Sequence, residues 1–182
     1  FFKQKTAYEI STRDWSSDVC SSDLTSGAAR CWGYNGYGER DVPADLGTAT
    51  AISNGERFTC AITTAGSVRC WGANWYGETD VPADLGTVSA VSTGENFACA
   101  RTTAGDVRCW GWNGYGQTDV PTDLGSVSAV STGGVHACAL TTAGDVRCWG
   151  YNGGYTLYVP GDLGTVTAIS ASGGGNAHSC AL

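Results

Sequence analysis

The stretch that decides the fold is TVSAVSTGENFACARTTAGDVRCWGWNGYGQTDVPTDLG, which occupies residues 87–125. The same pattern fills residues 48–86 and 126–164, and parts of it stand at 25–47 and 165–182. Its Arg-Cys-Trp triplet recurs every 39 residues, beginning at Arg30, Arg69, Arg108 and Arg147. A period of this length is typical of repeat architectures, in which each repeat is one structural unit.

Each repeat has the local signature of short β-strands joined by turns. TVSAVS is a β-branched run, NFACAR alternates large and small residues, and VRCWG follows the turn sequence TAGD. Gly66, Gly105 and Gly144 stand where a tight hairpin needs a positive φ. The segment DVPTDLG, with its Pro and Gly, predicts the connection to the next repeat. Three or four antiparallel strands per repeat predict an all-β fold of propeller blades.

Strand alternation assigns the side chains of VRCWG to two faces, with Val and Cys on one and Arg and Trp on the other. Because a blade is sandwiched between its neighbours, the repeated tryptophans are expected to pack between blades: Trp32, Trp71, Trp110 and Trp149. The Arg beside each Trp is expected to pair with an Asp of the DVP or ADLG segment.

Six of the nine cysteines lie symmetrically about the hairpin turns. This symmetry places the sulfurs opposite each other on adjacent strands, which predicts the disulfides Cys60–Cys70, Cys99–Cys109 and Cys138–Cys148. Zinc binding is the weaker alternative, because the spacing contains no short Cys-x-x-Cys knuckle. Three disulfides indicate an oxidising compartment. Cys31 and Cys180 are expected to lack partners, and so is Cys20.

Residues 1–24 do not share the repeat. They resemble the translation of the two constant arms of a short-read sequencing adapter, at residues 3–10 and 14–24. We therefore interpret 1–24 as a non-native leader and expect it not to pack on the repeats, with Phe1 and Trp15 left unburied. Residues 25–182 are then a partial propeller.

The run GGVHACALTTAGDVRCWGYN at 133–152, with GYGQTDVP at 114–121, resembles the repeat of the regulator of chromosome condensation family. The compact repeat followed by Val-Pro resembles the bacterial secreted version, to which a propeller-type β-lactamase inhibitor protein belongs. The family's His stands at His136 and His178 but is replaced by Phe58 and Phe97, which indicates packing.

The resemblance implies a ring of seven blades, of which this chain holds about four. We therefore expect an incomplete β-propeller in the form of an open arc with exposed apolar faces at both ends. A ring closed by Cys31 beside Cys180 is the alternative. It is disfavoured because blades wedged for roughly 51° per step would have to reach roughly 90°.

Composition and motifs favour binding over catalysis. The formal net charge of −7 argues against a nucleic-acid partner, which would need clustered cations. No apolar run approaches the length that spans a membrane. No nucleophile–base pair, metal-binding spacing or cofactor motif stands outside the repeat, so no enzyme activity, metal or cofactor is expected.

Aromatic residues that vary between repeats are the candidate partner-binding residues: Tyr34, Trp75, Trp112 and Tyr151. Tyr37, Tyr76 and Tyr115 recur at one position and are expected to fill gaps between blades. The leading hypothesis is a non-catalytic protein-interaction propeller from a secreted, periplasmic or cell-surface bacterial protein. Carbohydrate binding on the same aromatics is the alternative.

Overall fold

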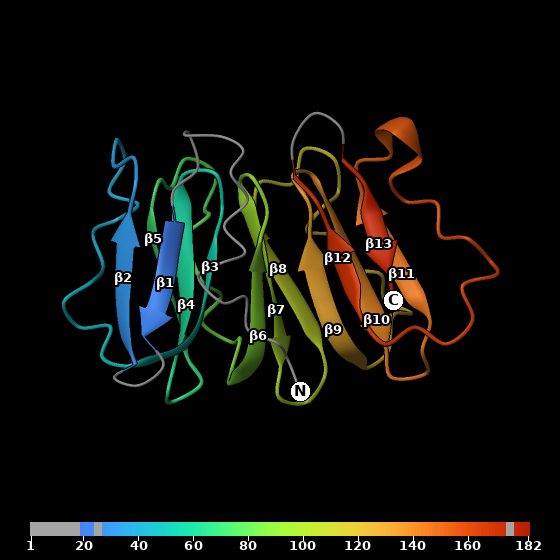
Figure 1. Cartoon of the computed structure of the whole chain (residues 1–182), viewed down its shortest axis with the longest axis horizontal. Coiled ribbons are helices and arrows are strands. Elements are labelled where there is room, and N and C mark those ends of the chain that lie inside the picture. Colours follow the sequence, from blue (N-terminus) through green and yellow to red (C-terminus); the bar gives the residue numbers. More distant parts are fainter. Residues whose placement is uncertain (1–18, 24–26, 174–176) are drawn as a thin grey trace.

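The computed structural model describes residues 19–23, 27–173 and 177–182. The chain forms five antiparallel sheets, of which the first four follow one another along the long axis in chain order and the fifth overlaps the fourth in this view (Figure 1). The three central sheets are three-stranded and consist of β3 (Ala49–Asn54), β4 (Phe58–Thr63) and β5 (Val68–Gly72); β6 (Val88–Thr93), β7 (Phe97–Thr102) and β8 (Val107–Gly111); and β9 (Val127–Thr132), β10 (His136–Thr141) and β11 (Val146–Gly150). In each, the second strand lies in the middle.

The sheets at the two ends have two strands each. They are formed by β1 (Val19–Asp23) with β2 (Ala28–Trp32), and by β12 (Ile169–Ala171) with β13 (Ser179–Ala181). A single 3₁₀ turn, η1 (Gly153–Tyr155), completes the regular structure of the described residues. The predicted all-β blades are confirmed. Of the three or four strands predicted for each repeat, the described residues form three.

The arrangement is an open arc. The sheet of β1 and β2 and the sheet of β12 and β13 lie at opposite ends of the long axis (Figure 1). Cys180 is free and exposed, whereas Cys31 is disulfide-bonded, so the two cysteines do not close a ring. The incomplete propeller predicted from the sequence is therefore what the structure has.

The expectation that the leader would not pack is wrong for residues 19–23. These residues form β1, which pairs with all five residues of β2 and brings Cys20 opposite Cys31. The expectation that Cys31 lacks a partner is wrong as well, because Cys31 is disulfide-bonded. The physical reason is that β2 offers an edge that any extended segment can pair with. Phe1 and Trp15 lie outside the described residues.

Three repeated tryptophans join consecutive sheets through one recurring hydrogen bond. The indole Nε1–H of Trp71 donates to the carbonyl oxygen of Glu39 at 2.8 Å. Trp110 donates in the same way to the Glu78 carbonyl at 2.9 Å, and Trp149 to the Gln117 carbonyl at 3.0 Å. All three indoles are buried. Each bond satisfies a carbonyl of the preceding repeat, as the packing role predicted for these residues requires.

The arginines that precede these tryptophans pair with the aspartates of the ADLG and TDLG segments, as predicted. The pairs are Arg69–Asp45 at 2.7 Å, Arg108–Asp84 at 3.3 Å and Arg147–Asp123 at 3.0 Å. The hydrogen bond and charge of Arg147 lower the pKa of Asp123. Because these side chains are largely exposed, each pair contributes little to stability and chiefly fixes the joint between repeats.

The three predicted disulfides are present, linking Cys60 to Cys70, Cys99 to Cys109 and Cys138 to Cys148. In each hairpin the two cysteines are directly opposite in the register, with Cα atoms 4.0–4.1 Å apart. The turn glycines have the predicted positive φ, 80° at Gly66, 93° at Gly105 and 95° at Gly144. In the chain-entropy account each bridge stabilises its hairpin by roughly 2–3 kcal/mol.

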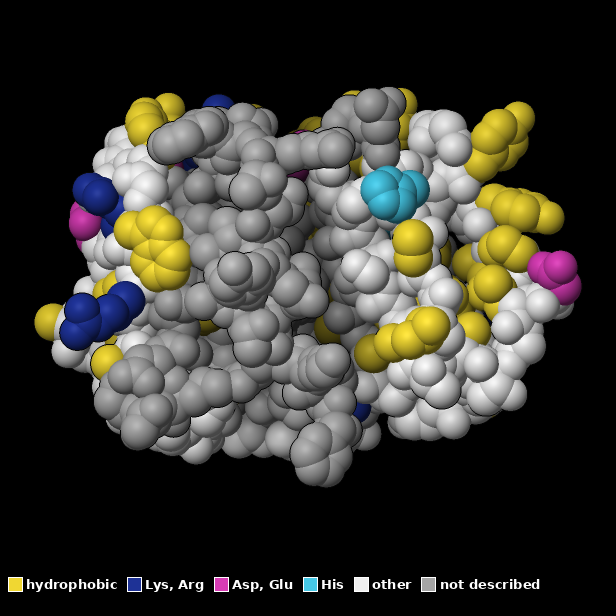
Figure 2. Space-filling view, in the orientation of Figure 1, with side chains coloured by type: hydrophobic (Ala, Val, Ile, Leu, Met, Phe, Trp, Pro, Cys, Tyr) yellow, Lys and Arg dark blue, Asp and Glu magenta, His cyan; other side chains and the backbone are white. Residues whose placement is uncertain are grey.

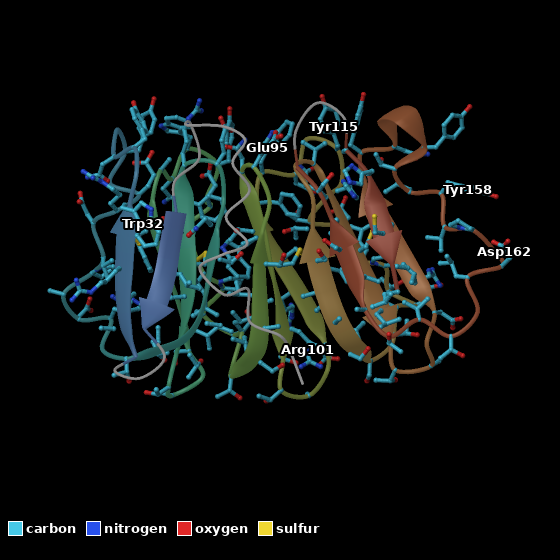
Figure 3. The ribbon with its side chains drawn as sticks, in the orientation of Figure 1. Trp32, Glu95, Arg101, Tyr115, Tyr158 and Asp162 are labelled. Atoms are coloured by element: carbon cyan, nitrogen blue, oxygen red, sulfur yellow. A yellow bond between two sulfur atoms is a disulfide. The ribbon has the colours of Figure 1, made fainter. Side chains whose placement is uncertain are left out.

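Both ends of the arc expose apolar side chains, as expected. Trp32 is 44% exposed, because no described repeat precedes it to supply a carbonyl acceptor. Leu163 is 38% exposed, although Leu46, Leu85 and Leu124 at the same repeat position are buried. Hydrophobic side chains are visible over the end that carries β11 to β13 (Figure 2). Trp32 and Asp162 mark the two ends in Figure 3.

His136 occupies the place that Phe58 and Phe97 fill in the two preceding repeats. It is fully buried, and its Nε2 lies 2.9 Å from the Ser179 hydroxyl. Its ring lies over Gly133, where a Cβ would approach the ring to 2.3 Å, just as Phe97 lies over Gly94. Burial lowers the pKa of His136, and electrostatic repulsion from the nearby His178 lowers it further.

Replacing His136 with Phe should reduce the acid sensitivity of the protein. Because the folded-state pKa of His136 lies below its ordinary value of 6.5, the unfolded chain binds a proton that the folded chain does not. The unfolding free energy of the wild type should therefore fall as the pH is lowered from 7 to 5, and His136→Phe should flatten this slope. Urea unfolding at pH 7 and pH 5 measures both. An identical slope in the two proteins would contradict the assignment.

Candidate binding surface

The loops that follow the third strand of each repeat carry the candidate residues. After Trp-Gly, each of the first three loops turns at a buried residue, Glu39, Glu78 or Gln117, which is 0% exposed, whereas the fourth loop has Thr156 at this position. The side-chain oxygen of the buried Glu or Gln accepts a hydrogen bond from the backbone N–H of the loop tyrosine, for example from Tyr76 to Glu78 at 2.7 Å. The loop Asn then bonds to an Asp six residues later, as Asn74 does to Asp80 at 2.8 Å. These bonds give the first three loops the same conformation.

Seven aromatic side chains of these loops form a row along one edge of the arc, which we call the aromatic rim: Tyr34, Tyr37, Trp75, Tyr76, Trp112, Tyr115 and Tyr151. Six of them are 42–58% exposed, and Trp112 is partly buried. Tyr115 is labelled at the upper edge of the molecule in Figure 3, on the same edge as Glu95.

Ring contacts cross from each repeat to the next. Tyr37 contacts Trp75 with ring centres 4.7 Å apart, and Tyr115 contacts Tyr151 at 4.6 Å. Tyr76 and Trp112 lie 6.1 Å apart. Tyr34–Tyr37 and Trp112–Tyr115 add contacts within the loops, at 6.5 Å and 5.1 Å. Such edge-to-face and tilted pairs stabilise one another, so the rim consists of two groups of contacting rings that meet at the neighbouring residues Trp75 and Tyr76.

The variable aromatic residue of the rim stands at one of two positions in the loop, two residues apart. The third repeat has Trp112 and then Gly114, where an added Cβ would lie 2.5 Å from the Trp112 ring. Gly36 and Gly153 leave room for Tyr34 and Tyr151 in the same way. The second repeat reverses the order, with a buried Ala73 and the aromatic at Trp75. The row therefore extends over all four loops although no single position is aromatic in every repeat.

All four candidate binding residues from the sequence lie in the aromatic rim, and the structure brings them into one row with three more. The expectation that Tyr37, Tyr76 and Tyr115 fill gaps between blades is wrong. They are 43%, 53% and 50% exposed, because the tryptophans of the strands already fill the joints between sheets. A tyrosine that recurs at one repeat position can therefore belong to the exposed rim, and its recurrence does not by itself indicate packing between blades.

In the second repeat a cation lies against the rings of the rim. The guanidinium carbon of Arg57 lies 5.6 Å from the Tyr37 ring centre and 5.3 Å from that of Trp75. Arg57 also pairs with Glu56 at 3.2 Å. These residues belong to the loop between β3 and β4, which reaches the same edge of the arc through the bond from the Ala73 N–H to the Arg57 carbonyl at 2.8 Å.

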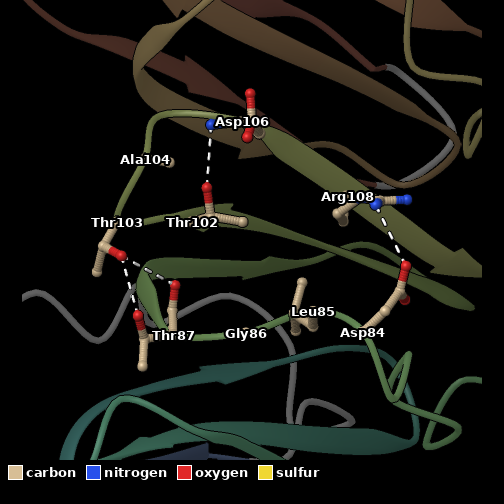
Figure 4. A pocket seen from close by; sticks show the side chains of 9 residues that line it. All are labelled: Asp84, Leu85, Gly86, Thr87, Thr102, Thr103, Ala104, Asp106 and Arg108. Carbon is tan, nitrogen blue, oxygen red and sulfur yellow. Dashed lines mark hydrogen bonds and ion pairs between the residues drawn. The ribbon is translucent and has the colours of Figure 1, made fainter.

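The described residues also have a concave feature outside the rim. A hollow of about 240 Å³ lies between a connecting segment and a hairpin turn of the third repeat (Figure 4), lined by Asp84, Leu85, Gly86, Thr87, Thr102, Thr103, Ala104, Asp106 and Arg108. Polar groups there already bond to one another, as Thr87 does to Thr103 at 2.9 Å and Asp84 to Arg108. The described part of the chain has no cluster of three metal-ligating side chains, and none of its helices could span a membrane.

The third repeat should tolerate the arrangement of the second, with the aromatic residue moved from position 112 to position 114. Gly114→Ala alone should push the Trp112 ring out of the row, because the new Cβ has no room. The double variant Trp112→Ala/Gly114→Trp copies the second repeat and should keep a ring in the row. Nuclear Overhauser contacts from the Tyr76 ring to a tryptophan measure this, because Tyr76 contacts Trp112 and the equivalent Tyr37 contacts Trp75. The account is wrong if the single variant keeps these contacts or the double variant loses them.

Comparison with known proteins supports the fold. A sequence profile of the regulator of chromosome condensation (RCC1) repeat matches residues 49–78, 88–117 and 127–155. No curated protein sequence matches the chain.

Several solved structures are similar in fold. The ectodomain of the Physcomitrella patens receptor kinase CR4 is 27% identical, with a TM-score of 0.72 over 86% of this chain and 45% of that one. The CRINKLY WD40 ectodomain of Arabidopsis thaliana ACR4 is 21% identical, with a TM-score of 0.66 over 91% and 56%. Saccharomyces cerevisiae Prp20p, studied for its binding to Gsp1p and histones, is 13% identical, with a TM-score of 0.77 over 91% and 53%.

The chain spans about half the length of these structures. The repeated tryptophan joints, the hairpins and the profile matches agree on one assignment. The chain contains three repeats of the RCC1 type and has the fold of an incomplete β-propeller.

Proposed function

We propose that the chain is part of a non-catalytic propeller that binds a protein partner through the aromatic rim. The observation that carries the proposal is the row of seven aromatic side chains, most of them on loops that are fixed by hydrogen bonds to a buried Glu or Gln. Tyrosine and tryptophan bury large areas at little entropic cost, and they are enriched among the residues that dominate protein interfaces. The RCC1-like Prp20p also binds proteins, and a structure of it with Kap60 is known.

A protein partner suits the rim better than a carbohydrate does. Stacking on a sugar needs an open, flat aromatic face. In the rim, Tyr37 and Trp75 stand at 80° to each other, and Trp112 and Tyr115 at 76°, so one face in each pair is covered by the edge of the other ring. The varied ring orientations offer pockets and edges for the side chains of a partner instead.

The Ser–His contacts in the last repeats do not make a catalytic pair. His136 lies 2.9 Å from the Ser179 hydroxyl, but its Nδ1 is buried without a hydrogen-bond partner. A nucleophile–base pair needs a third group that orients the base. Because Phe occupies the same place in two other repeats, the role of His136 is packing.

We further propose an extracytoplasmic location, in a secreted, periplasmic or cell-surface protein. Three disulfides close the hairpins, and such bonds persist in oxidising compartments. The similarity to two receptor ectodomains supports the same location. A net charge of −7 supports a protein partner over a nucleic acid.

Crosslinking from the rim tests the proposal. A photo-reactive amino acid at position 151 should give protein adducts from the secreted fraction of the source cells. The same group at Tyr158, an exposed residue outside the rim, should not. Trp112→Ala should weaken binding of the captured protein about tenfold or more, and Tyr158→Ala less than twofold. Adducts from both positions, or a glycan array signal that Trp112→Ala removes, would contradict the proposal.

A further inference from the structure

In the second repeat the rings of the rim bind a guanidinium group that belongs to the chain itself. The Arg57 guanidinium lies within 5.6 Å of two ring centres, those of Tyr37 and Trp75, and pairs with the Glu56 carboxylate. Aromatic faces attract cations through their negative quadrupole, and a carboxylate adds a charged hydrogen bond. We call this arrangement the filled seat, since the chain supplies its own cation.

The third repeat has a related pair of rings, in which the tryptophan stands at the repeat position of Ala73 rather than of Trp75 and the ring centres are 6.1 Å apart. Tyr76 and Trp112 supply the two rings, again one from each of two consecutive repeats. Glu95 takes the place of Glu56 and Asn96 takes that of Arg57, 39 residues further along. The backbone is equivalent, because the Trp112 N–H donates to the Asn96 carbonyl at 2.8 Å, as the Ala73 N–H does to Arg57. No ion pair among the described residues includes Glu95.

We propose that the vacant seat, formed by Tyr76, Trp112 and Glu95, binds the guanidinium group of an arginine side chain on a protein partner. The proposal rests on the proposed function of the rim and specifies the chemistry of the partner. Arginine fits better than lysine, because its planar guanidinium can stack on a ring and donate two parallel hydrogen bonds to a carboxylate at once. The net charge of −7 also favours encounter with a cationic segment.

The fourth repeat offers an internal contrast. Tyr115 and Tyr151 form its ring pair, but Gly134 and Val135 stand where the second repeat has Glu56 and Arg57. This pair has no carboxylate to balance a cation, so it is not expected to select a charged side chain. The selectivity for arginine therefore belongs to one place on the rim.

A small probe tests the seat in the full chain. N-acetyl-arginine methylamide should shift the indole N–H resonance of Trp112 in a saturable way. The neutral citrulline analogue, which has nearly the same shape, should bind at least fivefold more weakly. Glu95→Gln should weaken the arginine probe at least threefold, and the matched control Glu56→Gln should leave its binding unchanged.

The variant Asn96→Arg gives the decisive comparison, because it should fill the seat as Arg57 does and abolish the response to the probe. Unchanged resonances of Trp71, Trp110 and Trp149 would show that this variant is folded. Equal binding of the arginine and citrulline probes, or a full response in Asn96→Arg, would overturn the proposal. If Trp112→Ala still releases the captured partner while Asn96→Arg does not, the arginine seat is wrong and the rim function stands.

Discussion

The rest of the structure depends on the hydrogen bond from a strand tryptophan to the preceding repeat. Its acceptor is the backbone carbonyl of Glu39, Glu78 or Gln117, and both the indole and the acceptor residue are buried. A buried carbonyl without a partner is costly, so a sheet placed without this bond would lose stability. The same acceptor residue also receives the N–H of a rim loop on its side chain. One residue thus accepts a tryptophan N–H on its backbone carbonyl, which connects two sheets, and a loop N–H on its side chain, which fixes the rim loop.

This coupling explains why the rim is suited to binding. The rings do not sit on free loops, because each of the first three loops is fixed to the tryptophan contact beneath it and to an Asn–Asp bond beside it. The fourth loop is fixed by the bond from the Thr156 hydroxyl to the Tyr151 carbonyl. Little conformational entropy remains to be lost when a partner binds, which favours affinity. Because the joint is the same in each full repeat, the loops can vary in sequence without disturbing the fold. The exchange of Ala73 and Trp75 for Trp112 and Gly114 is one such variation.

Much of the fold could be predicted from the sequence, because a strict repeat makes each local signal appear several times. The hairpin symmetry of Cys99 and Cys109 was sufficient to predict a disulfide. The pairing of β1 with β2 could not be foreseen, since residues 19–23 share no pattern with the repeats and pair through backbone groups that any sequence has. The exposure of Tyr115 was missed because strand periodicity does not extend into loops. The role of the difference between Arg57 and Asn96 could not be predicted either, because it depends on ring contacts between consecutive repeats that the sequence does not show.

Hydrogen exchange at the tryptophan indoles tests the central claim most directly, because it reports the joints and the rim in one experiment. The account predicts slow exchange for Trp71, Trp110 and Trp149, whose N–H groups are buried and bonded to carbonyls. It predicts fast exchange for Trp75 and Trp112 on the rim, and for Trp32 at the open end of the arc. Exchange of the three joint tryptophans at the rate of the rim tryptophans would contradict it.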